Sequence, residues 1–274
     1  MRPLVIIAAA LAATGHTASA QSVLLRMKPP EGQVTHYQAV VETYMHGGPM
    51  AQMATDTTQP FMRMHMWQTT TVTAESGDQH TLNQVVDSAR VESPAVPQMS
   101  AMMSQTGQMM QGTATTMDMT SRGKVTALDV KLPPQLQSMM SAQGGNTMGM
   151  GGGASGNLSS FVLLPERPVQ VGSTWRDSMT VNLDSAGTAG AKASFAATFT
   201  LKRMEGRVAV IGIDGTLSMS GGSMPAPSSF DMTGETKLDL DAGRVTAMTT
   251  EMSGSVASPM GEIPMRMTMK MTMQ

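Results

Sequence analysis

The chain has 274 residues, of which 41% are hydrophobic and 14% charged, and its formal net charge is −2. This charge is too small to indicate nucleic-acid binding, and the absence of cysteine excludes disulfides, thiolate metal sites and cysteine nucleophiles. Leu, Ile, Val and Phe together supply 46 residues, about 17% of the chain, which is below the roughly 20% expected of a folded domain. The 32 Met raise this total to 78, so we expect Met to build much of the core.

Residues 1–20 have the three parts of a secretory signal peptide. Arg2 supplies the positive start, an apolar stretch too short to span a bilayer follows, and Ala18-Ser19-Ala20 forms a small-x-small cleavage site. We therefore predict an exported protein, periplasmic or secreted, whose mature chain begins at Gln21. No cysteine follows the apolar stretch, so we expect no lipid anchor. No later segment is long and apolar enough to predict a transmembrane span.

Alternation of apolar and polar residues dominates the mature chain. Met occupies every second position in Met62–Met66 and again in Met265–Met273. Successive side chains of a strand point to opposite faces, so this spacing places the sulfurs of each segment on one face of a strand. Eleven strands are predicted: Val34–His46, Phe61–Thr73, Gln79–Glu92, Thr113–Thr120, Val125–Lys131, Trp175–Asp184, Ala191–Arg203, Val208–Ser218, Ser229–Leu240, Val245–Ser255 and Glu262–Gln274.

An internal repeat relates the two halves of the mature chain. The pentapeptide Gly-Lys-Val-Thr-Ala at Gly123 resembles Gly-Arg-Val-Thr-Ala at Gly243, and a similar hairpin signal occurs at Gly77 and Gly206. Glycine at such places supplies the positive φ that tight hairpins need. We therefore predict two similar antiparallel β-units.

Two segments interrupt the strand pattern. Ser93–Gln111 is predicted as either a short helix or a loop, and Pro133–Gln143 as a helix. Residues 143–157 are Gly-rich and are predicted to be a flexible linker. The predicted organisation is a signal peptide (1–20), a first β-unit (21–142), the linker (143–157) and a second β-unit (158–274). The fold class is mainly β, and the two units can form one curved sheet or half-barrel, with one or two short helices.

Two short motifs resemble a known family. Leu164–Trp175 reads apolar-Pro-x-x-Pro-Val-x-Val-Gly-x-x-Trp, and Leu25–Gly32 reads Leu-Arg-x-Lys-x-x-x-Gly. Both are similar to elements of a family of uncharacterised bacterial secreted proteins and lipoproteins with Met-rich β-repeats. The resemblance implies the fold and the compartment, and it implies no activity. The chain departs from the lipoprotein members because it lacks the cysteine that would carry the lipid.

Clusters of Met beside His raise the possibility of a copper site. A thioether is a soft, neutral ligand suited to Cu(I), and imidazole also binds copper. The best candidate set is Met45, His46, Met50 and Met53, because the Gly and Pro between them predict a loop that can fold around one ion. Met also packs irregular cores well, so for the strand Met a place in the core is the competing interpretation.

The interpretation we favour is a Met-lined binding surface. Met side chains adapt to varied ligands, and two sheets with Met faces can enclose an apolar ligand or bind an envelope protein. No GxSxG, HExxH or phosphate-binding loop occurs, so we expect no enzyme, no catalytic residues and no cofactor. The predicted function is a non-enzymatic exported binding protein. The alternative is a periplasmic Cu(I)-binding or oxidant-buffering protein, and the sequence leaves the oligomeric state open.

Overall fold

A computed structural model describes residues 22–47, 56–142, 162–183, 190–221, 226–258 and 261–274. The described residues form a mainly β protein, as predicted. Its strands are β1 (Val34–Met45), β2 (Met62–Ser76), β3 (Gln79–Glu92), β4 (Ala114–Thr120), β5 (Val125–Lys131), β6 (Thr174–Asn182), β7 (Lys192–Glu205), β8 (Val208–Ser220), β9 (Ser228–Asp239), β10 (Arg244–Ser258) and β11 (Gly261–Met273). Its helices are η1 (Pro97–Met99), α2 (Ser100–Met109) and α3 (Pro134–Ala142).

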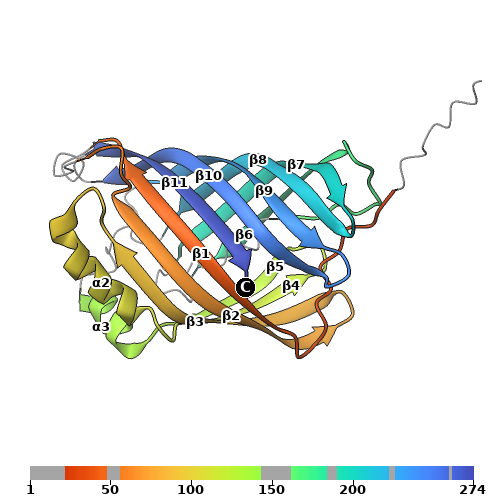
Figure 1. Cartoon of the computed structure of the whole chain (residues 1–274), viewed down its shortest axis with the longest axis horizontal. Coiled ribbons are helices and arrows are strands. Elements are labelled where there is room, and N and C mark those ends of the chain that lie inside the picture. Colours follow the sequence, from red (N-terminus) through yellow and green to blue (C-terminus); the bar gives the residue numbers. More distant parts are fainter. Residues whose placement is uncertain (1–21, 48–55, 143–161, 184–189, 222–225, 259–260) are drawn as a thin grey trace, which may run out of the picture.

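All eleven strands belong to one antiparallel sheet with the order β5-β4-β3-β2-β1-β11-β10-β9-β8-β7-β6. The sheet curves until it nearly closes on itself (Figure 1), and its two edge strands, β5 and β6, contact each other. The prediction of a curved sheet is therefore confirmed. The C-terminal strand β11 lies between β1 and β10, and it joins the beginning of the sheet to its end.

The concave face is lined by the residues that alternation assigns to one side. Met62, Met64 and Met66 of β2 are buried, whereas the intervening side chains face outward and are half-buried or exposed. On β11, Met269 and Met271 are buried in the same core. This is the period-two pattern of a sheet with one covered face.

The register of the sheet brings these Met side chains together in two rows that run across the strands. Residues directly opposite each other in an antiparallel pair have Cβ atoms about 4.5–5.5 Å apart. The first row is Met66, Ala39, Met271 and Met248. The second row is Met62, Thr43, Met267, Met252 and Met232. Strands β7 and β8 complete the core with Phe, Leu and Ile side chains.

The segment Ser93–Gln111, predicted as a helix or a loop, contains η1 and α2. The helix α2 packs against β3 at Gly107, where a Cβ would lie 3.0 Å from both Ala89 O and Val91 N. A larger residue would fit here only if the helix or the strand moved by a few tenths of an ångström. Met99 and Met103 pack from this segment against the core. The helix predicted at Pro133–Gln143 corresponds to α3.

Strands β1–β5 and β6–β10 make corresponding backbone contacts. Gly32 and Gly172 precede β1 and β6 with φ of +79° and +88°. Their N–H groups donate to Val72 O and Leu201 O at 2.9 and 2.7 Å. Each acceptor strand has a bulge directly after this residue. The pair β1–β2 and the pair β6–β7 therefore begin with the same backbone arrangement.

The matched turns also correspond. Ser121 N donates to Asp78 O at 2.7 Å and joins the β4–β5 turn to the β2–β3 turn. Leu240 N donates to Arg207 O at 3.0 Å and joins the β9–β10 turn to the β7–β8 turn. Strands β6–β10 thus correspond to β1–β5, while β11 is additional and η1 and α2 are inserted between β3 and β4. The division into units 21–142 and 158–274 remains a prediction, because the linker 143–157 lies outside the described residues.

Candidate functional site

The predicted copper-binding set is only partly within the described structure. Met45 ends β1, is half-buried and lies opposite Met265 of β11. His46 is exposed, and its backbone N donates to Pro264 O at 3.1 Å. The other two predicted ligands, Met50 and Met53, lie outside the described residues. Among the residues that are described, no group of three or more His, Cys, Asp or Glu is arranged to hold a metal ion.

The histidines occupy contrasting environments. His65 faces outward from β2 and stacks on Trp67, with ring centroids 6.2 Å apart, so it lies on the opposite side of the strand from the Met. His80 at the start of β3 is 1% exposed, and neither ring nitrogen has a hydrogen-bond partner in the described part of the chain. The sequence gives no signal that distinguishes this buried His80 from the other strand histidines.

The Met-lined interior also contains polar atoms that lack partners. Thr43 Oγ1, Gln68 Oε1 and Thr236 Oγ1 are buried, and none makes a hydrogen bond within the described residues. An unpaired buried polar group costs about 1–3 kcal/mol. Most polar atoms in protein interiors are paired. Gln68 Oε1 can therefore accept a hydrogen bond from a guest, and the two threonine hydroxyls can accept or donate one.

Tyr37 is a buried polar side chain that does have a defined partner. Its hydroxyl donates to Val245 O at 2.8 Å across the C-terminal strand. Burial raises the pKa of this hydroxyl from 10.0 to about 12, and the nearby charge of Arg244 opposes the rise. Tyr37 is therefore neutral at physiological pH and serves as a fixed hydrogen-bond donor.

A seam separates the two edges of the sheet. Strand β5 pairs only with β4 and β6 only with β7, so within the described strands no ladder of hydrogen bonds joins β5 to β6. Two segments, 22–28 and 162–171, lie beside this seam and are joined to each other by a bridge between Val23 and Val169. We call these two segments the strap. Leu25 and the run 162–164 are fully buried, so the strap is anchored in the core.

The strap forms backbone hydrogen bonds with the β4–β5 turn and with the corresponding β9–β10 turn. Met27 N donates to Ser121 O at 2.8 Å, and Lys28 N donates to Gly243 O at 2.9 Å. A Cβ at Gly243 would lie 2.4 Å from Lys28 O, so a larger residue does not fit there without movement. Adjacent residues of the strap thus connect the β4–β5 turn to the β9–β10 turn.

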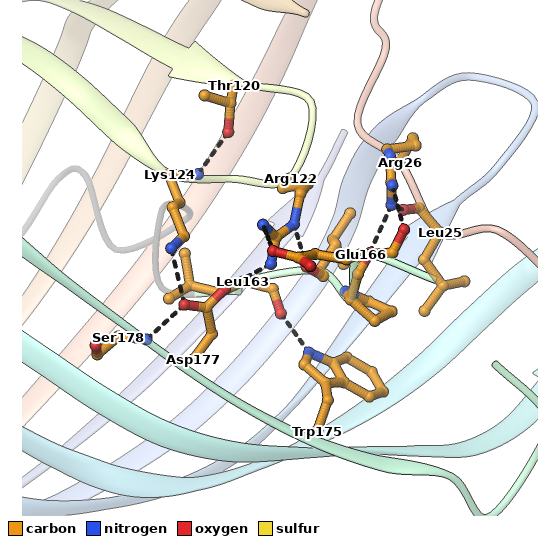
Figure 2. Close-up of polar contacts among 12 residues, drawn as sticks. Leu25, Arg26, Thr120, Arg122, Lys124, Leu163, Glu166, Trp175, Asp177 and Ser178 are labelled. Atoms are coloured by element: carbon orange, nitrogen blue, oxygen red, sulfur yellow. Dashed lines mark hydrogen bonds and ion pairs between the residues drawn. The ribbon is translucent and has the colours of Figure 1, made fainter. Parts of the chain in front are cut away.

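Ion pairs close the seam at the β4–β5 turn (Figure 2). Arg122 donates through Nη2 to Asp177 Oδ2 at 2.7 Å, through Nη1 to Glu166 Oε1 at 3.0 Å and through Nε to Leu164 O at 2.9 Å. Lys124 Nζ lies 2.9 Å from Asp177 Oδ1. We call the contacts of Asp177 with Arg122 and Lys124 the seam ion pairs. These ion pairs connect β6 to the β4–β5 turn at the other edge of the sheet, where no backbone hydrogen bonds join the described parts of the two edge strands.

A surface cavity of about 440 Å³ opens at the seam ion pairs. This volume is within the range of small-molecule sites, roughly 300–1,000 Å³. Polar side chains and one aromatic ring line it: Arg122, Glu166, Arg167, Trp175, Arg176 and Asp177. The strap contributes apolar surface at Pro165 and Val169. We call this space the seam cavity.

Trp175 connects the seam cavity to the core. Its indole Nε1 donates to Leu163 O at 2.7 Å, which fixes the ring against the strap. The ring stacks on Phe199 with centroids 5.7 Å apart, and Phe199 in turn packs edge-on against Phe195. Both Phe side chains are buried. The sequence identified Trp175 as a strand residue but gave no indication of the ion pairs beside it.

Comparisons with known proteins give little functional information. The family described as "Family of unknown function (DUF6263)" matches residues 137–274, half of the chain. No curated protein matches. Among solved structures, the chain is similar to Salmonella typhi OmpF in complex with daunomycin, at 8% sequence identity and a TM-score of 0.24, over 91% of this chain and 100% of that one. Within the described residues, no helix is both long and apolar enough to cross a membrane.

Proposed function

The chain belongs to the family of unknown function DUF6263, and from this premise we propose that it binds an apolar ligand inside its curved, Met-lined sheet. The observation that carries this proposal is the combination of sheet size and lining. A closed sheet of eight strands has an interior that side chains alone can fill. This nearly closed sheet has eleven strands, and we infer from this number that its interior can hold a guest beside the core side chains.

The chemistry of the lining supports an apolar guest. The two Met rows extend over five strands, β2, β1, β11, β10 and β9. Met is unbranched and polarisable, so a Met surface repacks around guests of different shape at little cost. The unpaired interior atoms of Thr43, Gln68 and Thr236 add hydrogen-bonding positions for a guest with a few polar groups. Few, well-placed polar groups in an apolar site are typical of ligand pockets.

Export forms part of this proposal. Residues 1–20, which lie outside the described residues, have the pattern of a signal peptide, and the motifs at Leu25–Gly32 and Leu164–Trp175 resemble secreted proteins. We expect a non-enzymatic binding protein of the bacterial envelope. The test is the mass of the protein recovered from the periplasm of an expressing bacterium, which should correspond to a chain that begins at Gln21. Recovery of the full-length chain from the cytoplasm alone would contradict export.

Binding is tested with the uncharged dye N-phenyl-1-naphthylamine and Met labelled with ¹³C at the methyl group. We expect saturable fluorescence enhancement and shifts of the Met66, Met248 and Met271 methyl resonances. The matched control is Met102 of α2, which is 60% exposed and should not shift. Absence of saturable dye binding, or shifts confined to Met102, would refute the proposal.

A substitution pair on one strand provides a second test. Ala39 faces inward between Met66 and Met271, and its neighbour Gln38 faces outward. Ala39→Trp should fill the interior and reduce dye binding, whereas Gln38→Trp should leave it intact. If Ala39→Trp fails to fold, the methyl resonances of the wild-type chain decide the question without it. Equal dye binding by both folded variants would count against an interior site.

A second candidate function is Cu(I) binding at Met45, His46, Met50 and Met53. One observation favours it: Met45 lies opposite Met265, so the register brings a further thioether beside the predicted ligands. Titration with Cu(I) against a competing chelator should then show saturable binding. The binding should be lost in the triple variant His46→Ala, Met50→Leu, Met53→Leu. Unchanged affinity in that variant would exclude the site. Oxidant buffering instead predicts sulfoxide formation at exposed Met such as Met102 without unfolding.

A further inference from the structure

The seam cavity has an excess of positive charge on a chain that is slightly acidic. Six basic residues line the cavity, pair with its residues or belong to the adjoining strap, and two acidic residues, Glu166 and Asp177, accompany them. The six basic residues are Arg26, Lys28, Arg122, Lys124, Arg167 and Arg176. The whole chain carries 18 basic and 20 acidic residues. A local surplus of cations against this background favours an anionic ligand.

The basic residues divide into those that hold the structure together and those that do not. Arg122 uses all three guanidinium nitrogens on Asp177, Glu166 and Leu164 O. Arg26 donates to carbonyl oxygens of the strap. Both acidic side chains are therefore already paired. Arg167 and Arg176 line the seam cavity, are exposed, and form no ion pair with any described residue.

Arg167 and Arg176 approach the cavity from different elements. Arg167 belongs to the strap and Arg176 to the edge strand β6. Arginine presents a planar fork of donors that matches carboxylate and phosphate oxygens. Arg176 alternates with Trp175 and Asp177 along β6 and is the exposed one of the three, so it lies at the outer rim of the cavity. Two such exposed groups lining one cavity can bind a single anionic head group.

An apolar wall leads inward from the same cavity. Trp175 lines it and stacks on buried Phe199, which contacts Phe195 of the core. This wall runs from the charged mouth toward the core. No backbone ladder joins the described residues of β5 and β6, so a chain that follows this wall has to pass only the strap and the seam ion pairs.

From these observations we propose that the seam cavity binds the anionic head group of a single-chain amphiphile, a carboxylate or phosphate, between Arg167 and Arg176. The hydrocarbon tail enters along Trp175 between the edges of β5 and β6. This inference rests on the proposed function, since it requires that the interior accept an apolar chain, and it adds the class of ligand. The seam ion pairs frame the head-group site and remain intact in this arrangement.

The test compares three probes with the same tail: dodecanoate, dodecyl phosphate and the uncharged dodecyl maltoside, each below its micelle-forming concentration. We expect the two anionic probes to displace the uncharged dye with affinities on the order of tenfold higher than the maltoside, because each makes charge-assisted contacts with arginine. This preference should shrink as salt is added. Equal affinities for the three probes would overturn the inference.

The variant for this test is Arg167→Gln/Arg176→Gln. Its matched control is Arg90→Gln/Arg207→Gln, which removes the same charge from two arginines that are 70% and 64% exposed and remote from the seam in sequence. The first variant should lose most of the preference for anionic probes and retain dye binding, while the control keeps both. An equal loss in both variants would show a general charge effect and would contradict the site.

Two further arms separate this inference from the proposed function. Inorganic phosphate and butyrate should compete weakly, since they lack the tail; competition as strong as that of dodecyl phosphate would show an anion site without an apolar guest and overturn the inference. If neither the dye nor any dodecyl probe binds, the proposed function itself fails. If the dye binds but the anionic preference is absent, only the inference fails.

Discussion

Two junctions join strands β1–β5 to strands β6–β10, and they differ in how they are closed. At the first junction, β11 lies between β1 and β10 and forms hydrogen-bonded ladders with both. At the second junction, the described parts of β5 and β6 share no ladder, and the seam ion pairs and the strap connect them instead. The strand that distinguishes the two junctions is the additional Met-rich strand at the C-terminus. The seam is therefore the junction that can open with the least loss of backbone hydrogen bonds.

Corresponding residues at the two junctions show the same contrast. Tyr37 is five positions after Gly32, and Asp177 is five positions after Gly172, so the two occupy corresponding positions on β1 and β6. Tyr37 is covered by β11, is buried and contacts the start of β10. Asp177 is on an edge strand and pairs with Arg122 and Lys124 at the β4–β5 turn. We call the first junction, which β11 fills, the covered junction, and the second, at the seam, the open junction. The covered junction has a neutral hydrogen bond at the position where the open junction has an ion pair.

The largest expected effect comes from weakening the covered junction. Met271 of β11 is 2% exposed, and Met271→Ala should lower the free energy of unfolding by about 2–5 kcal/mol. Met179 of the edge strand β6 is half-buried, and Met179→Ala should cost on the order of 1 kcal/mol. Urea unfolding followed by circular dichroism measures both. Equal losses would contradict the distinction between the two junctions.

Alkaline pH tests the neutral hydrogen bond of the covered junction. The pKa of Tyr37 is about 12 in the folded chain against 10.0 for an ordinary tyrosine, so folding disfavours its ionised form. Stability from this group is fully present below pH 10 and is lost as the pH rises toward 12. The expected loss is about 2–3 kcal/mol of unfolding free energy.

Urea midpoints between pH 8 and pH 11.5 measure this effect. Tyr37→Phe should flatten the pH dependence in that range. Tyr44→Phe is the comparison at the second of the two tyrosines: burial and the hydrogen bond to Glu42 also raise the pKa of Tyr44, but it is more exposed, so its substitution should flatten the dependence less. The same slope in wild type and Tyr37→Phe would show that another group controls the alkaline unfolding.

Opening the seam should cost less. In Asp177→Asn, Arg122 and Lys124 lose their shared carboxylate, and because the pair is partly buried we expect a loss of about 1–3 kcal/mol. Hydrogen exchange should speed up at the backbone of β5 and β6 and stay unchanged at β11. The control is Asp241→Asn, which breaks an ion pair with Arg207 in which both side chains are 64% exposed and should cost at most about 0.5 kcal/mol. Exchange that speeds up uniformly would indicate general destabilisation instead of an opened seam.

The sequence predicts the strands well because strand alternation is a local signal. Gln79–Glu92 and Val125–Lys131 are predicted with the bounds that the structure has. The single curved sheet is also consistent with the pattern, since each strand has only one apolar face to cover. The Met of β2 and β11 lie on the concave face because their period of two leaves them no other arrangement.

The seam cavity was not predictable from the same patterns. Arg122 and Asp177 are 55 residues apart and meet only because the two edge strands come together. Alternation along a strand is a local pattern, so it does not predict which turn lies next to which edge strand. The nearest signal was the motif Leu164–Trp175, which contains Arg167 and Trp175 but was informative only about family. The copper hypothesis relied on proximity in sequence, and two of its four residues lie outside the described structure.

The smallest expected effect concerns the flexibility of the Met lining itself. Met66 of β2 and Phe195 of β7 are corresponding positions when the hairpins are aligned on Gly77 and Gly206, and both are buried. Met66→Leu conserves volume and should change the unfolding free energy by less than about 1.5 kcal/mol. A branched side chain adapts less readily than Met, so the variant should bind bulky uncharged dyes more weakly and small ones as before.

Phe195→Leu provides the comparison, because it removes ring contacts with Phe199 and should cost more stability than Met66→Leu does. Isothermal titration with a size series of uncharged dyes measures the first effect, and urea unfolding measures the second. If Met66→Leu costs as much as Phe195→Leu and leaves the size series unchanged, the Met rows act as an ordinary rigid core. If only the size series changes, the Met rows form the adjustable wall that an apolar ligand requires, and the Phe and Ile side chains of β7 and β8 form the fixed wall opposite it.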